Sequence, residues 1–120
     1  MPHNTFCHIE FDSTDLARSQ RFFEGLFGWT FRAFGEKMVV FGLGDQHLGG
    51  LQKADNVAPG RSPSVWIEVA SLDPMVTKAV GSGGSLERGR EEVPGVGWSA
   101  VVKDPDGNFV GLVEFSRQEG

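Results

Sequence analysis

The chain has 120 residues and a mass of 13.0 kDa, which suits one domain that can bury a core without disulfides. Its formal net charge is −5 and its Lys and Arg residues are scattered, which argues against nucleic acid as a partner. No apolar run approaches the roughly 20 residues of a membrane span, and the first residues lack the basic and apolar stretches of a secretory signal. Cys7 is the single cysteine, so an internal disulfide is excluded. We therefore expect a soluble, cytoplasmic protein without nucleic acid or membrane partners.

A short alternating stretch occurs twice in the chain. Cys7-His8-Ile9-Glu10-Phe11 is matched by Val65-Trp66-Ile67-Glu68-Val69, and each copy is followed at the same offset by Asp15 or Asp73. An acidic residue at that place can open a helix. This internal repeat predicts two similar modules, each beginning with a strand and a helix.

The first module is expected to contain a strand, a helix and three further strands. The helix begins at about Asp15 and stops before Gly28, and its inward stripe carries Leu16, Phe23 and Phe27 with Phe22 and Leu26 beside them. Trp29 is expected to pack near the end of this helix. The expected strands are residues 6–11, 29–34, 38–43 and 46–52.

Residues 53–63 are polar and carry two turn-forming pairs, so they are interpreted as a linker. In the second module Asp73 is the expected N-cap, with Pro74 at the first helical position, and the helix ends at Gly81. Strands are expected at residues 64–69, 85–90, 97–103 and 109–115, the last two joined by a turn at residues 104–107. The result is an α+β chain: module one at about residues 5–52 and module two at about 64–116, within a single domain spanning residues 1–120.

Several motifs in this order resemble the vicinal oxygen chelate superfamily, which contains glyoxalase I, bleomycin-resistance proteins and extradiol dioxygenases. They are the His-Ile-Glu first strand, the Phe-Gly-Trp after the first helix, the Gly-Gly-Leu ending the first half and the Asp-Pro-Asp-Gly-Asn before the last strand. The resemblance covers residues 6–115. It implies two βαβββ modules curling around a shared cleft, and a homodimer.

In metal-dependent members of that superfamily, ligands come from the first and last strands of each module. His8 matches the first such position, but Trp66 and Gly111 occupy the two positions of the second module. At the end of the first module only Gln52 could coordinate a metal. Because Trp and Gly donate nothing to a metal, we expect no cofactor. The alternative is a divalent metal held by His8 with Glu10 or Glu68.

Strand alternation places His8 and Glu10 on one face and Cys7, Ile9 and Phe11 on the other, which a helix should cover. By the same logic Trp66 and Glu68 face the cleft, where an aromatic wall suits a planar or cationic guest. The ligand-binding candidates are His8, Glu10, Gln52, Trp66, Glu68, Trp98 and Gly111, with Trp98 expected to rim the opening. His8 and Glu10 are also the candidate acid and base, although both could simply be solvated.

Three other residues are expected to play no part in the site. His47, beside a hairpin turn, is interpreted as exposed and inert. Glu114 is three residues after Gly111, so it faces the other side of its strand and cannot replace a ligand there. Cys7 is expected to be inert packing beneath the helix.

These observations favour a protein that binds or sequesters a small organic molecule without a catalytic metal, in the manner of bleomycin-resistance proteins. Two alternatives stay open. One is a metal-dependent lyase or dioxygenase; the other is a metal-free enzyme that uses His8 and Glu10 as acid and base.

Overall fold

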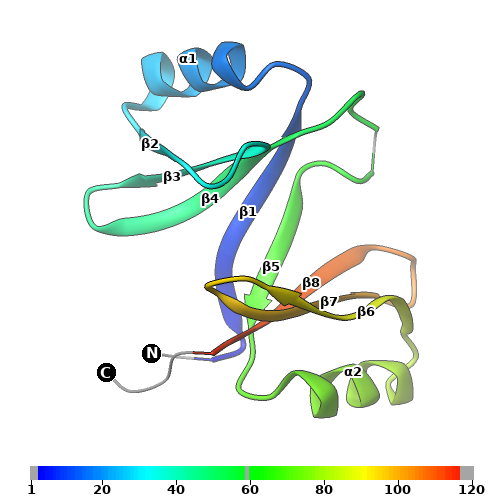
Figure 1. Cartoon of the computed structure of the whole chain (residues 1–120). Helices are drawn as coiled ribbons and strands as arrows, with labels where there is room; N and C mark the ends of the chain where they lie inside the picture. The colour runs from blue at the N-terminus through cyan, green and yellow to red at the C-terminus, as the bar shows by residue number, and fades with distance from the viewer. Residues whose placement is uncertain (1–2, 59, 117–120) are drawn as a thin grey trace. The chain divides into compact units, whose positions relative to one another are not determined.

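The computed structural model describes residues 3–58 and 60–116, which form a strand, a helix and three strands, twice over (Figure 1). The elements are β1 (Thr5–Ser13), α1 (Leu16–Phe27), β2 (Thr30–Ala33), β3 (Met38–Leu43), β4 (Gln46–Lys53), β5 (Ser64–Glu68), α2 (Leu72–Gly81), β6 (Ser85–Val93), β7 (Gly97–Lys103) and β8 (Phe109–Phe115). The α+β class and the two βαβββ units expected from the sequence are confirmed. Neither helix of the described residues has the length and apolarity needed to cross a membrane.

The chain divides into two compact units that differ slightly from the expected modules. Residues 7–64 form the N-terminal module, and residues 65–116 together with residues 3–6 form the C-terminal module. The start of β1 thus belongs with the second half, where the backbone N–H of Asn4 donates to the carbonyl of Glu68 at 2.7 Å. Residues 54–58 and 60–63 contain no helix or strand, in keeping with the expected linker. The expectation that both modules form one domain stays a prediction, as does the shared cleft.

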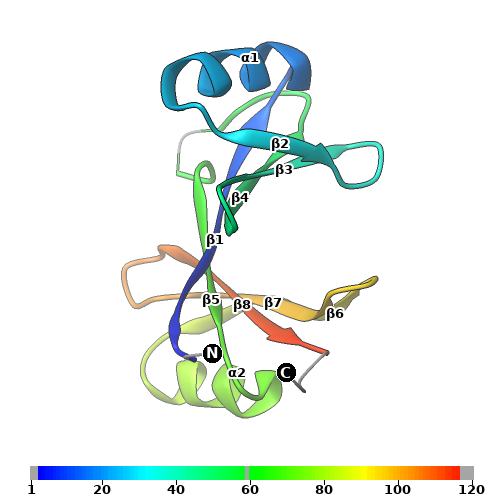
Figure 2. The ribbon, with the colours of Figure 1, turned by 90° about the vertical axis from the view of Figure 1, so that its left-hand side faces the viewer.

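The N-terminal module has the strand order β2-β3-β4-β1, with β1 parallel to β4 and the other neighbours antiparallel (Figure 2). One face of this sheet carries α1. The ring of Phe23 on α1 lies 5.1 Å from Phe11 of β1 and 6.4 Å from Phe41 of β3. Trp29 stacks on Phe41 at 4.6 Å and on Phe27 at 4.8 Å, as expected for a residue packed near the helix end. Aromatic stacking therefore stabilises the packing of the helix on the sheet.

Both ends of α1 are where the sequence predicts them. The face of the helix that the sheet buries is narrower than the apolar face expected from the sequence. The Asp15 carboxylate accepts from the backbone N–H of Arg18, and Gly28 ends the helix with φ 73°. Phe22, Leu26 and Phe27 are 60%, 59% and 52% exposed. The expected burial of these three residues was wrong because only the line through Leu16 and Phe23, which are two turns apart, meets the sheet.

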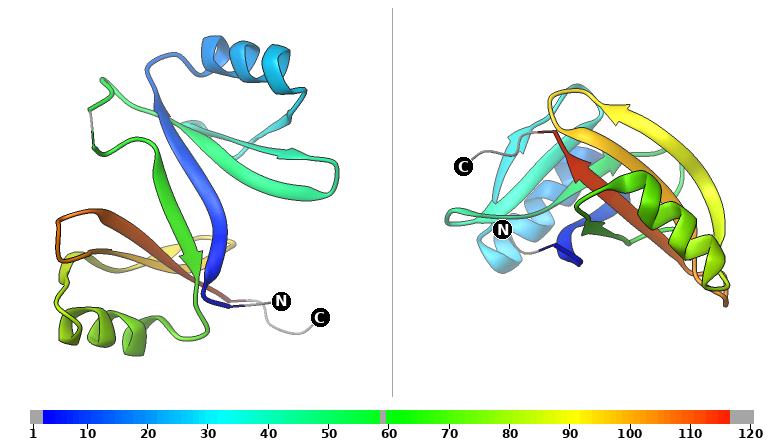
Figure 3. Two further views of the ribbon diagram at one scale, coloured as in Figure 1. Left: turned by 180° about the vertical axis from the view of Figure 1, so that it is seen from behind. Right: turned by 90° about the horizontal axis from the view of Figure 1, so that it is seen from below.

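The C-terminal module has the strand order β5-β8-β7-β6, with β5 parallel to β8 and the other neighbours antiparallel. Helix α2 lies across one face of this sheet (Figure 3). The core between them consists of Val69, Leu72, Ala100, Val102 and Leu112, with Ile67 packed against it. Since Ile67 faces the helix, the alternation predicted for residues 65–69 is confirmed in this module.

The start of α2 differs from the expectation. The N-cap is Ser71 rather than Asp73, and Pro74 is the third helical residue. Leu72 is fully buried, and drawing it into the core begins the helix two residues early. The Ser71 side chain makes no capping bond; instead the Glu114 carboxylate accepts from the backbone N–H of Leu72 at 2.8 Å. Glu114 therefore lies on the helix side of β8, opposite Gly111, as predicted.

Candidate functional site

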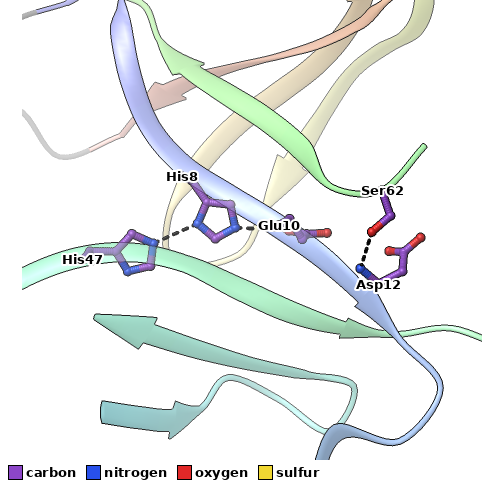
Figure 4. A network of polar contacts seen from close by, with 5 residues as sticks. All are labelled: His8, Glu10, Asp12, His47 and Ser62. Atoms are coloured by element: carbon purple, nitrogen blue, oxygen red, sulfur yellow. Dashed lines mark hydrogen bonds and ion pairs between the residues drawn. The ribbon is translucent and has the colours of Figure 1, made fainter. Parts of the chain in front are cut away.

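The face of the N-terminal sheet opposite α1 carries a polar row from β1. His8, Glu10 and Asp12 alternate along this strand (Figure 4). Phe11, between Glu10 and Asp12, packs on Phe23 of the helix. Each of the His8 and Glu10 side chains is 18% exposed. The His8 ring lies over Gly50, whose missing side chain leaves room for it: a Cβ there would lie 3.4 Å from His8 Cε1. The sequence therefore predicted the orientation of this pair correctly.

Both ring nitrogens of His8 are engaged. Nε2 lies 3.1 Å from Glu10 Oε1, and Nδ1 lies 2.8 Å from Nε2 of His47. An ionised Glu10 can only accept, so it takes the Nε2 proton of a neutral His8. His8 Nδ1 then accepts, and His47 Nε2–H donates. The three side chains form a relay along which a proton can move from His47 toward Glu10.

His47 is a correction to the sequence interpretation. It is exposed, as expected, but it is not isolated: its ring stacks on His8 with centroids 5.0 Å apart and planes 14° apart. The pairing register between β3 and β4 shifts between Phe41 and Gly42, which leaves Leu48 as an extra residue in β4. Strict alternation would have placed His47 on the opposite face, and this β-bulge turns it toward His8.

Electrostatic shifts occur at both ends of the polar row. Partial burial of the His47 ring lowers its pKa, and repulsion from Arg32 and from His8, whenever His8 is protonated, lowers it further. Burial raises the pKa of Asp12, and repulsion from Glu10 adds to the effect while Arg61 opposes it. The Asp12 backbone N–H donates to Ser62 Oγ at 2.9 Å, which ties β1 to the segment after β4. The two shifts in pKa thus favour the neutral forms of both His47 and Asp12.

Gln52 lies on this face but far from His8. The sheet register pairs Gln52 with Asp12 on one side and Met38 on the other. Asp12 is four residues along β1 from His8, a separation of about 13 Å at 3.3 Å per residue. Gln52 and His8 therefore cannot hold one metal ion together.

In the C-terminal module, Trp66 and Gly111 form a single packed unit. They are register partners across β5 and β8, and the six-membered ring of Trp66 lies directly against Gly111, where a Cβ would collide with three ring atoms. Glu68 follows on the same face, 13% exposed, with its carboxylate 3.8 Å from His3 Nε2. Trp66 and Glu68 thus face away from the helix, as predicted from strand alternation.

Trp98 was expected to rim the opening, but the structure places it elsewhere. It packs against the core cluster beside α2, on the same face of β7 as Ala100 and Val102. The Arg90 guanidinium lies 4.9 Å from the centre of its ring. Strand alternation could have predicted this position, because Trp98 is two and four residues before Ala100 and Val102 and therefore lies on the same face of β7.

Comparison with known proteins agrees with this architecture. The family model described as a glyoxalase-like domain matches residues 8–113. The chain belongs to the glyoxalase-like domain family. The resemblance to the vicinal oxygen chelate superfamily is thereby confirmed, along with the coarse assignment of the chain to it.

Individual relatives of this glyoxalase-like domain are distant. CFP32 of Mycobacterium tuberculosis, whose name provisionally calls it a glyoxylase, is 25% identical over 93% of this chain, which spans 46% of that protein. The chain therefore spans about half the length of the curated relatives it matches. A Mn(II)-bound glyoxalase from Novosphingobium aromaticivorans has a TM-score of 0.71 at 14% identity, covering 98% of this chain and 42% of that one. The hypothetical protein BH1468 from Bacillus halodurans has a TM-score of 0.73 at 12% identity, covering 97% of both chains.

The residues of this glyoxalase-like domain do not fit the metal site of its metal-dependent relatives. The two ligand positions of the C-terminal module hold an indole ring packed on a glycine, which offers no donor. In the N-terminal module both nitrogens of His8 are bonded, and Gln52 is out of reach. Within residues 3–58 and 60–116, no three His, Cys, Asp or Glu side chains group together so as to hold a metal ion.

Proposed function

We propose that this glyoxalase-like domain binds a small organic molecule on the helix-free faces of its sheets, without a resident divalent metal. The residues proposed for ligand binding are His8 and Glu10 in the N-terminal module and Trp66 and Glu68 in the C-terminal module. Binding or sequestration, as in bleomycin-resistance proteins, is the activity that needs nothing more than such a surface. A metal-dependent lyase or dioxygenase is disfavoured by the absence of donors at Trp66 and Gly111.

The observation that carries the proposal is the packing of Trp66 on Gly111. The indole is supported from behind by the backbone of Gly111, and this contact fixes the orientation of the ring. A rigid aromatic surface binds planar groups with little loss of conformational entropy. The neighbouring Glu68 carboxylate adds an attraction for a cationic substituent.

Acid–base catalysis by His8 is the second candidate, and the hydrogen bonds of His8 favour it. An imidazole held by Glu10 on one nitrogen and by His47 on the other can exchange a proton with a bound molecule and be restored through the relay. His8→Asn separates the two candidates. Turnover lost with ligand affinity kept within about tenfold would support an enzyme; affinity lost without any turnover in the parent would support a binding protein.

Ligand binding is tested by a thermal-shift screen of planar aromatic compounds, because a ligand that binds only the folded state raises the melting temperature. For a compound that binds, Trp66→Ala should weaken affinity by about 1–3 kcal/mol, whereas Trp66→Phe should keep most of it. Equal affinity of the parent and Trp66→Ala would remove Trp66 from the binding residues.

Metal content is tested by elemental analysis of protein purified without chelators. We expect less than stoichiometric zinc, nickel, iron and manganese. One tightly bound ion per chain, lost in His8→Ala, would overturn the metal-free proposal.

We also propose that the protein acts in the cytoplasm as a homodimer. The edge strands β2 and β6 end the two sheet orders and offer unpaired backbone groups, and covering such edges is one use of dimerisation. Light scattering at micromolar concentration tests the dimer, for which a mass near that of one chain at every concentration would count against it.

A further inference from the structure

The N-terminal module contains a pocket, bordered by His47, to which no function has been assigned above. Its volume is about 300 Å³, and it opens on β2, β3 and the hairpin that joins β3 to β4. Its lining residues are Thr30, Phe31, Arg32, Val40, Phe41, Gly42, Gly44, Asp45, Gln46 and His47. A pocket of this size accepts a molecule of about a dozen heavy atoms or fewer.

Arg32 and His47 both line this pocket, together with Val40 of β3. Val40 is 8% exposed and shares the sheet face of Arg32, whereas the Phe41 ring packs on the opposite face, under α1. Arg32 lies on edge strand β2, paired in register with Val40, and this places its side chain on the same sheet face as His8 and Glu10. The proximity of Arg32 to His47 is also evident in the lowered pKa of that histidine.

Arg32 has a charge that the protein leaves uncompensated. Within the described residues, no carboxylate lies at ion-pair distance from its guanidinium, whereas Arg88 and Arg90 are paired with Glu91 and Asp73. A guanidinium suits a planar carboxylate, which it can hold with two parallel N–H···O bonds.

We infer that this pocket is a carboxylate subsite, in which Arg32 pairs with the carboxylate of a small organic acid bound beside His47 and Val40. His47 borders the same pocket, so the bound carboxylate lies beside the His47–His8–Glu10 relay. The inference rests on the proposed function only in taking the ligand to be a small organic molecule. It narrows the ligand class to small carboxylic acids.

Asp45 is the one carboxylate in the pocket lining. It repels a simple carboxylate ligand but would attract an ammonium group. The Asp45→Asn variant therefore distinguishes an organic acid from a cationic or zwitterionic ligand.

The test is a titration of the ¹⁵N-labelled protein with benzoate and with its neutral isostere benzamide, followed by amide chemical shifts. Benzoate is expected to shift amides of β2, β3 and the β3–β4 hairpin, and to bind at least about tenfold more tightly than benzamide, since hydrogen bonds to charged groups are the stronger ones. Arg32→Gln should weaken benzoate binding by about tenfold or more. Arg21→Gln, the same change on exposed helix α1, should leave it unchanged.

Asp45→Asn should leave benzoate affinity unchanged or increase it. Benzoate binding that survives Arg32→Gln, equal affinity for benzamide, or weaker binding in Asp45→Asn would each overturn the subsite. The spectra report in the same experiment whether each variant is folded. If the carboxylate subsite is overturned, the proposed function is still tested independently by the Trp66 variants.

Discussion

The indole ring of Trp66 lies against the bare backbone of Gly111, its register partner across the parallel pair β5–β8. The resemblance to metal-dependent proteins assigns ligands to these two positions, and in this structure each residue depends on the other. A side chain at position 111 would displace the ring, and without the ring Gly111 would leave the sheet face bare. Trp66 and Gly111 therefore act as one structural unit, so a change at either position should affect the other.

This coupling predicts that Gly111→Ala is destabilising only while Trp66 is present. The added methyl would collide with the indole, and forcing the ring aside should lower the free energy of unfolding by about 1–3 kcal/mol. In a Trp66→Ala background the same substitution should cost less than about 0.5 kcal/mol. Urea denaturation of the four proteins in this double-mutant cycle gives the coupling energy. Additive effects would show that the ring is free to move away.

The cap of α2 predicts a second stability effect. Glu114 on β8 accepts from the Leu72 backbone N–H, while the N-cap Ser71 makes no such bond. Removing a capping acceptor commonly costs about 1 kcal/mol, and here the carboxylate also faces the positive end of the helix. Glu114→Ala should therefore lower the free energy of unfolding by about 1–2 kcal/mol.

The control is Glu114→Gln, which keeps an acceptor oxygen and should recover part of that loss. Hydrogen exchange should localise the effect to the first turn of α2. A uniform loss of protection across the module, equal in both variants, would argue against a capping role.

The pattern of the sequence was enough for most of the fold. β3, β7 and β8 match the expected bounds, and the faces of His8, Glu10 and Trp66 follow from alternation because each strand has a helix on one side only. Alternation fails at His47, since the bulge at Leu48 changes the parity of β4 and leaves no obvious signature in the sequence. Gln52 failed for a different reason: ligand assignment by position along the chain ignores the sheet register, which places it beside Asp12.

Asp12 predicts a pH-dependent stability difference. Its folded-state pKa is raised above 3.8 by burial and by Glu10, so the stability it contributes is fully present below the unfolded value and is lost as the pH rises through the folded value. Asp12→Asn mimics the neutral form and should raise the free energy of unfolding at pH 7. The gain should shrink as the pH falls through the folded-state pKa of Asp12, because the parent then also becomes neutral.

Urea denaturation across this pH range measures the difference between the two proteins. Asp55→Asn, in the exposed segment after β4, is the matched control and should show no such trend. A gain for Asp12→Asn that is constant with pH would mean that the carboxylate acts through its shape rather than its charge.

His47 predicts a pH dependence of stability that is opposite in sign to that of Asp12. Its folded-state pKa is lowered from 6.5, first by burial and then by the charges of His8 and Arg32, so its contribution to stability is present above the unfolded pKa and is lost as the pH falls through the folded one. NMR titration of the His47 ring should therefore give a pKa below 6.5. Arg32→Gln removes one of the two neighbouring charges and should raise that pKa, whereas Arg21→Gln on α1 should not. If both variants left the His47 pKa where it is in the parent, Arg32 would lie too far from the ring to share a ligand with it.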